Sequence, residues 1–71
     1  NLENKNYFYW MSSSAFTYAI NKYPNIKNKF HFCGPGNTYK EIKKILGDES
    51  QNLTVELSYK DWKNKILPLN N

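Results

Sequence analysis

The sequence has few of the residues that crosslink small proteins. Its 71 residues include one cysteine, Cys33, so an internal disulfide is excluded. One cysteine and one histidine, His31, cannot make a structural zinc site, which needs four ligands. A chain of this length buries only about 60% of the surface that it exposes when unfolded, so its stability must come from a small apolar core.

Arginine is absent, and all ten basic residues are lysines. They are interleaved with six carboxylates, and the formal net charge is +4. Proteins that read nucleic acids use arginine for bidentate contacts with guanine and phosphate. The lack of arginine therefore disfavours a nucleic acid as the partner, and we expect the lysines to form a solvated surface.

Long apolar runs are also missing. No stretch approaches the ~20 residues that span a bilayer, so we expect no membrane span. No basic segment followed by an apolar one marks a signal peptide, and a lone cysteine is compatible with a reducing compartment. These absences predict a cytoplasmic protein.

Aromatic side chains are abundant: two Trp, six Tyr and four Phe make up 17% of the sequence, too large a share for a disordered chain. Residues 7–11, Tyr-Phe-Tyr-Trp-Met, form a continuous apolar run that favours a strand buried on both faces. Exposed aromatic rings could instead stack on bases or sugars. Because the chain has little other core material, we expect these rings to pack inside.

Two segments in the first two thirds of the chain have the apolar spacing of an amphipathic helix. The first follows three serines, residues 12–14, which are preferred N-caps. It ends before Pro24, because the residue before a proline is disfavoured in a helix. The second starts at a capping box formed by Thr38 and Glu41 and ends at Gly47, in the position of a C-terminal glycine cap.

A third helical segment lies between Ser58, a candidate N-cap, and Pro68, which stops the helix. The segments between these elements are polar. We expect residues 25–29 and 48–52 to be connections, and the tail, residues 70–71, to be frayed.

Two more strands complete the pattern. Residues 30–33 form a short apolar run, and residues 53–57 alternate strictly, which predicts a strand with one buried face. The β-α-β-α-β-α order indicates an α/β fold, a Rossmann-like half-domain whose three strands form a parallel sheet. Such a sheet leaves two open edges, so we expect residues 1–71 to be a single unit that belongs to a larger domain or assembly.

The connection after residues 30–33 is the sharpest candidate site. Gly34, Pro35 and Gly36 turn the chain ahead of Asn37 and Thr38, where a helix begins. Glycines let a ligand approach the backbone, and the N–H groups and positive dipole end of a helix attract anions. Ligands of open α/β sheets also bind beyond the carboxyl ends of the strands. We therefore predict a phosphate or nucleotide site here.

Alternatives stay open at this connection. Tyr39 stands where the dinucleotide fingerprint has its third glycine, and the Gly-Lys-Ser/Thr ending of a P-loop is absent, so a tight connection that binds nothing fits as well. Cys33 and His31 share a sheet face and could form a reactive pair, but no third group orients them. We expect a buried thiol and a core histidine instead, and helix capping rather than anion binding by residues 12–14.

One stretch resembles a known family. Residues 19–36 contain a helix, a polar turn with proline, a strand and a Gly-x-Gly turn; a helix, a strand that starts with Asn, and a short helix follow. This order resembles the C-terminal, donor-binding domain of nucleotide-sugar glycosyltransferases with the GT-B architecture, over about residues 7–67. The resemblance implies that Gly34 to Thr38 lie near the donor nucleotide, and that Ser58 and Tyr59 lie near its base.

The sequence also departs from that family. The family carries a basic residue near the first strand for the diphosphate, whereas residues 11–14 contain none, and the acidic motif for the donor sugar and the acceptor domain are absent. The resemblance thus implies a nucleotide-sugar-binding portion of a glycosyltransferase-like protein that is not catalytically complete alone. We assign no catalytic residue, metal ligand or cofactor to it.

A second hypothesis belongs to another class. The chain could be a small protein–protein interaction or inhibitor module, of a phage or regulatory kind, that binds its partner through an aromatic and lysine-bearing surface. An exposed patch formed by Tyr9, Trp10 and Trp62 would favour this hypothesis, because large exposed apolar patches mark partner surfaces.

Overall fold

Three parallel strands form one sheet at the centre of the structure, a computed structural model that describes residues 1–71. The strands β1 (Tyr7–Trp10), β2 (Phe30–Cys33) and β3 (Leu53–Val55) lie in the order β1-β2-β3. The register pairs Tyr7 with Phe30 and His31 with Leu53. These findings confirm the predicted α/β class, the β-α-β-α-β-α order and the Rossmann-like half-domain.

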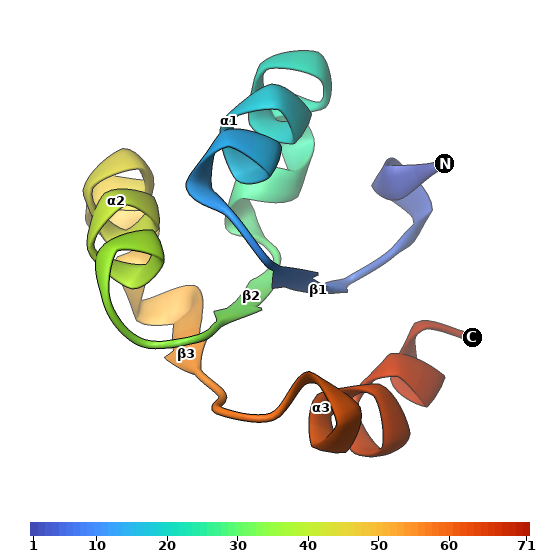
Figure 1. The fold of residues 1–71 in the computed structure, drawn as a ribbon. Coiled ribbons are helices and arrows are strands. Elements are labelled where there is room, and N and C mark those ends of the chain that lie inside the picture. Colours follow the sequence, from blue (N-terminus) through green and yellow to red (C-terminus); the bar gives the residue numbers. More distant parts are fainter.

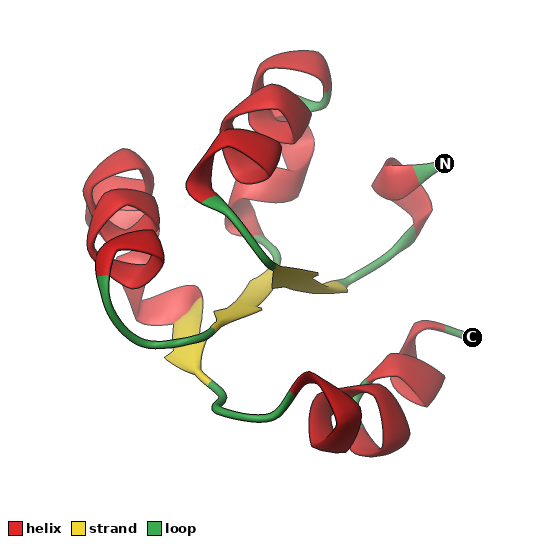
Figure 2. Cartoon of the chain, viewed as in Figure 1, coloured by secondary structure: helices red, strands yellow, loops and turns green.

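The helices form a layer on each face of the sheet (Figure 1, Figure 2). Helices α1 (Ser13–Lys22) and α2 (Asn37–Leu46) lie on one face, and α3 (Tyr59–Lys65) lies on the other. Right-handed crossovers between neighbouring strands place α1 and α2 on the same side. Four short 3-10 helices complete the chain: η1 (Leu2–Asn4), η2 (Pro24–Asn28), η3 (Gly47–Asn52) and η4 (Leu67–Asn70).

Serine caps begin two of the helices, as predicted. The Ser12 hydroxyl accepts from the Ala15 N–H at 3.2 Å, and the Ser58 hydroxyl accepts from the Asp61 N–H at 3.1 Å. Helix α2 differs, and the capping box predicted there is wrong.

The N-cap of α2 is Gly36, which makes no side-chain cap, so Thr38 already lies inside the first turn. The Glu41 carboxylate accepts instead from the Ser13 hydroxyl of α1, at 3.0 Å. Because the helix already begins at Asn37, the Thr38 side chain is not in the N-cap position that a capping box requires.

The core fills the space between the sheet and helices α1 and α2. Its buried apolar members are Phe8, Trp10, Phe16, Ala19, Ile26, Cys33, Ile42, Leu46 and Leu53. Within it His31 is fully buried and uses both ring nitrogens: the Trp10 indole N–H donates to Nδ1 at 3.0 Å, and Nε2 bonds the Ile26 carbonyl at 2.8 Å. This pairing satisfies the one buried polar side chain of the core.

The connection after α1 is more than the polar segment that the sequence predicts. Pro24 does end α1 but also opens the helix η2, which turns Ile26 into the core, where it is fully buried. The interpretation of residues 25–29 as purely polar was therefore wrong at Ile26.

The third strand is shorter and more exposed than predicted. It ends at Val55, and only Leu53 is buried; Val55 is 40% exposed and Leu57 is 79% exposed. Because β3 is an edge strand, side chains toward its end lie beyond the cover of the helices. The expectation of one fully buried face therefore fails at Val55 and Leu57.

The tail is tied to the sheet rather than frayed. The Asn70 side-chain oxygen accepts from the N–H groups of Asn6 and Tyr7, and its amide nitrogen donates to the Tyr7 carbonyl, each at 2.9 Å. We call these three bonds the Asn70 clasp. After α3 the chain returns beneath the sheet to β1, so the two ends of the chain lie on the same side of the molecule (Figure 1).

Candidate functional site

A small cavity lies at the carboxyl end of the sheet, where β1 and β2 end and α2 begins. Its volume is about 200 Å³. It is lined by Tyr9, Trp10, Met11, Gly34, Pro35 and Thr38. Three of the predicted nucleotide-binding residues thus meet in one cavity, and Gly36 and Asn37 lie in the same connection without lining it.

The connection Gly34-Pro35-Gly36 leaves the backbone open at this place. Gly36 has φ 100° and ψ −145°, a conformation that L side chains rarely adopt, so the position favours glycine. A Cβ atom at Gly34 would lie 3.9 Å from the Tyr9 hydroxyl, an ordinary contact. The conformational requirement for glycine is therefore at Gly36, whereas at Gly34 the absence of a side chain chiefly leaves room in the cavity.

The first turn of α2 has no side-chain cap, in contrast to α1 and α3. Its early N–H groups lack partners within the helix, and they carry the positive end of the helix dipole. The Lys40 N–H is the first to bond back, to the Gly36 carbonyl at 3.1 Å. The amides of Asn37, Thr38 and Tyr39 are therefore the donors that this end of the sheet offers.

Two polar groups at the carboxyl end of the sheet were missed from the sequence. The Tyr9 hydroxyl donates to the Glu56 backbone carbonyl at 2.8 Å. Burial raises the Tyr9 pKa, with the charges of Cys33 and Glu56 adding to the effect, so the phenol stays protonated and remains a donor at neutral pH.

The second missed group is the Glu56 carboxylate. It follows β3 directly and accepts from the Ser58 N–H at 3.3 Å. Glu56 stands twenty residues after Gly36, and an acidic residue at about that spacing binds the ribose hydroxyls in dinucleotide-binding folds. That spacing was the signal in the sequence that could have identified it.

Ser58 and Tyr59 do not join the cavity. Ser58 caps α3 with its hydroxyl. Tyr59 packs against Tyr9, with ring centroids 5.2 Å apart, and against Trp62, at 6.0 Å. Neither of these two predicted base-binding residues therefore lines the cavity at the glycine connection.

A larger groove lies on the α3 side of the sheet, with a volume of about 650 Å³. It runs between η1, β1, α3 and η4, and Tyr59 is part of its wall. We call it the α3 groove. Its other aromatic and basic lining residues are Tyr7, Phe8, Tyr9, Trp62, Lys5 and Lys63.

The thiol–imidazole hypothesis does not fit the structure. Both nitrogens of His31 are engaged by Trp10 and Ile26, and burial lowers the His31 pKa from 6.5. Burial also raises the Cys33 pKa from 9.0, which keeps the thiol protonated and unreactive. Both residues are core residues, as expected.

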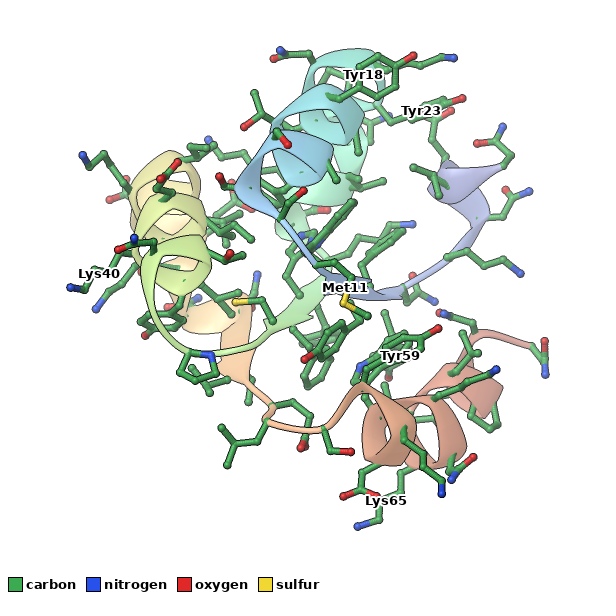
Figure 3. The ribbon with its side chains drawn as sticks, in the orientation of Figure 1. Met11, Tyr18, Tyr23, Lys40, Tyr59 and Lys65 are labelled. Carbon is green, nitrogen blue, oxygen red and sulfur yellow. The ribbon has the colours of Figure 1, made fainter.

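The exposed aromatic patch that would favour an interaction module is not formed. Trp10 and Trp62 are buried, and Tyr9 is half-buried. The exposed large apolar side chains lie at other positions, among them Met11, Tyr18, Leu57 and Leu69. In Figure 3 Met11 and Tyr18 occupy different parts of the molecule, so no single patch joins them.

Neither a metal centre nor a known relative helps to interpret the site. No group of three or more His, Cys, Asp and Glu side chains is placed to hold a metal ion, and no helix has the length and apolar character needed to cross a membrane. Searches of protein-family models, curated proteins and solved structures found no match to this chain. The resemblance to glycosyltransferases and the cytoplasmic location therefore stay predictions.

Proposed function

We propose that the chain is a nucleotide-binding half-domain, and that it holds the diphosphate of a nucleotide sugar at the carboxyl end of its sheet. The observation that supports this function is the uncapped start of α2, joined to the glycine connection at the cavity. Backbone N–H groups at a helix start are a common anchor for phosphate groups. Helices α1 and α3 offer no equivalent, because serine hydroxyls accept from N–H groups in their first turns.

In this proposal each residue has a definite task. The N–H groups of Asn37 and Thr38 donate to phosphate oxygens, and the Thr38 hydroxyl adds a further donor from the cavity wall. Gly36 keeps the approach free of a side chain. The Glu56 carboxylate accepts from ribose hydroxyls. The chain supplies binding and orientation only, and group transfer needs residues that it does not contain.

No lysine lines the cavity, so the helix dipole and the amides carry the attraction for the phosphates. We therefore expect weak binding by this chain alone. The remainder of a larger domain, or a partner, would supply the cation that the family resemblance leads one to expect near residues 11–14.

The test is a titration of the ¹⁵N-labelled chain with UDP, GDP and CMP, followed by NMR. We expect saturable shifts of the Gly34, Gly36 and Thr38 amides. Thr38→Val should weaken binding about two- to tenfold, the loss expected for one hydrogen bond, whereas Thr54→Val, on the exposed strand β3, should not. Absence of shifts at the glycine connection with all three nucleotides would overturn the proposal.

A further inference from the structure

The α3 groove lies on the opposite face of the sheet from the core, and the phosphate site proposed above does not use it. Its volume of about 650 Å³ falls within the range of about 300–1,000 Å³ that is typical of sites for small molecules. The groove is therefore large enough to bind a small molecule, and its lining residues indicate which kind.

The wall of the groove is aromatic. Tyr59 and Trp62 stack with centroids 6.0 Å apart and an interplanar angle of 21°, and Tyr9 meets Trp62 at 5.6 Å. Such rings favour stacking with another flat ring. The wall therefore fits a planar ligand better than a flexible aliphatic one.

The same wall contains an unpaired donor. Trp62 is only 4% exposed, and its indole Nε1 has no hydrogen-bond partner. A buried N–H without a partner is costly, and native proteins rarely leave one. Trp10, the other tryptophan, donates its indole N–H to His31. The Trp62 side chain thus borders the groove as a covered residue, and its indole N–H resonance reports on a ligand bound there.

The charged side chains around the groove have one sign. Lys5 and Lys63 line it, and none of its lining side chains is a carboxylate. The side-chain amides of Asn64 and Asn70 supply neutral polar groups beside them. The groove is thus complementary to an anion, because an anionic group gains two ammonium partners there and meets no acidic side chain in the lining.

We propose that the α3 groove binds a small planar aromatic anion, with its ring against the partly exposed Tyr59 and its anionic group toward Lys5 and Lys63. The rings supply the stacking surface and the lysines supply the charge. The linings of this site and of the diphosphate site share only Tyr9, and neither proposal rests on the other, so each can fail alone.

The test uses 2-naphthoate as the probe and the neutral 2-naphthamide as its matched control. The two indole N–H resonances in a ¹H–¹⁵N spectrum report on Trp62 and Trp10 separately. We expect 2-naphthoate to shift the Trp62 resonance in a saturable way and to leave that of Trp10 in place. We also expect 2-naphthamide to bind several-fold more weakly.

A charge variant sharpens the result. Lys63→Gln should weaken 2-naphthoate binding about two- to fivefold, the effect of one exposed ion pair. Lys65→Gln is the matched control on the same helix, because Lys65 is not part of the groove lining and points away from the sheet (Figure 3).

Three outcomes would overturn this proposal. One is the absence of a saturable Trp62 shift with 2-naphthoate, another is equal binding of the amide, and the third is an equal effect of the two lysine variants. If UDP shifts Trp62 and leaves Gly36 unmoved, the groove proposal is supported and the diphosphate proposal fails.

Discussion

The two faces of the sheet are made by the same three strands but are packed very differently. On the face toward α1 and α2, Phe8, Trp10, His31 and Cys33 are buried, and the histidine is held by two hydrogen bonds. On the face toward α3 Trp62 is buried but other rings are only partly covered: Tyr59 is 41% exposed, and Phe30 is 48% exposed where it stacks on Tyr7.

This difference indicates that the face covered by α1 and α2 contributes most of the stability, and that the face toward α3 leaves room for a ligand. Two helices cover the first face, whereas one short helix crosses the second and leaves the α3 groove beside it. The first face is closed and satisfied in its hydrogen bonds. The second keeps partly exposed aromatic rings, among them Phe30 and Tyr59, which are a property of a binding surface rather than of a core.

The largest expected effect contrasts one truncation on each face. Ile42→Ala removes a fully buried side chain of α2 and should lower the free energy of unfolding by about 2–5 kcal/mol, from lost burial and the cavity left behind. Phe30→Ala, on the open face, should cost about 1 kcal/mol, because the ring is half exposed and chiefly loses its stacking on Tyr7.

The measurement for this pair is urea unfolding followed by circular dichroism. A domain of this length has a total stability of about 4–11 kcal/mol, so Ile42→Ala should bring the chain close to unfolding at 37 °C. Equal losses for the two variants would break the comparison between the faces.

An intermediate effect is expected at the Asn70 clasp. Asn70→Ala removes three hydrogen bonds, one to Asn6 and two to Tyr7 at the start of β1, and should cost about 1–2 kcal/mol, less than their gross sum because water replaces them. The exposed neighbour provides the control, since Asn71→Ala should change the stability by less than about 0.5 kcal/mol. Amide hydrogen exchange at Tyr7 should accelerate in the first variant only; unchanged exchange there would show that the clasp does not hold the edge of β1.

The smallest expected effect is on the pH dependence of the closed face. Burial holds the His31 pKa below 6.5 in the folded chain, so the unfolded chain binds a proton at a pH where the folded chain does not. The free energy of unfolding should therefore fall as the pH drops from 7.5 through 6.5 toward 5. Thermal unfolding across this range measures the slope, and His31→Gln should flatten it; an unchanged slope in that variant would assign the effect to other groups.

The fold was largely predictable because the local sequence patterns mark most of the helices and strands that the sheet brings together. The serine caps and Pro24 each mark a boundary that the structure keeps. The apolar run at residues 7–11 predicts β1, but the strand ends at Trp10, Met11 is 67% exposed, and only Phe8 and Trp10 of the strand are buried. The capping box at Thr38 failed because a glycine with positive φ starts the helix earlier. Ile26 was missed because a single apolar residue in a polar stretch has no periodicity, and only the turn of η2 places it in the core.

The sites were harder to predict because they depend on contacts between distant segments. Gly34, Pro35 and Thr38 meet as expected, since they are neighbours in sequence. The groove could not be foreseen, because it needs α3 to return beneath the sheet to β1. Asn70 shows the same limit: its side chain bonds Tyr7 across 63 residues, and no local pattern predicts such a contact.

The Asn70 clasp makes nearly the whole chain into one closed loop, and this has a consequence for access to the α3 groove. Closing a loop of that length costs entropy before any contact repays it, so we expect the clasp to form last in folding and to open first. Asn70 is also part of the groove lining. Release of the clasp would therefore widen the groove by local opening of η4, at a free energy well below that of global unfolding.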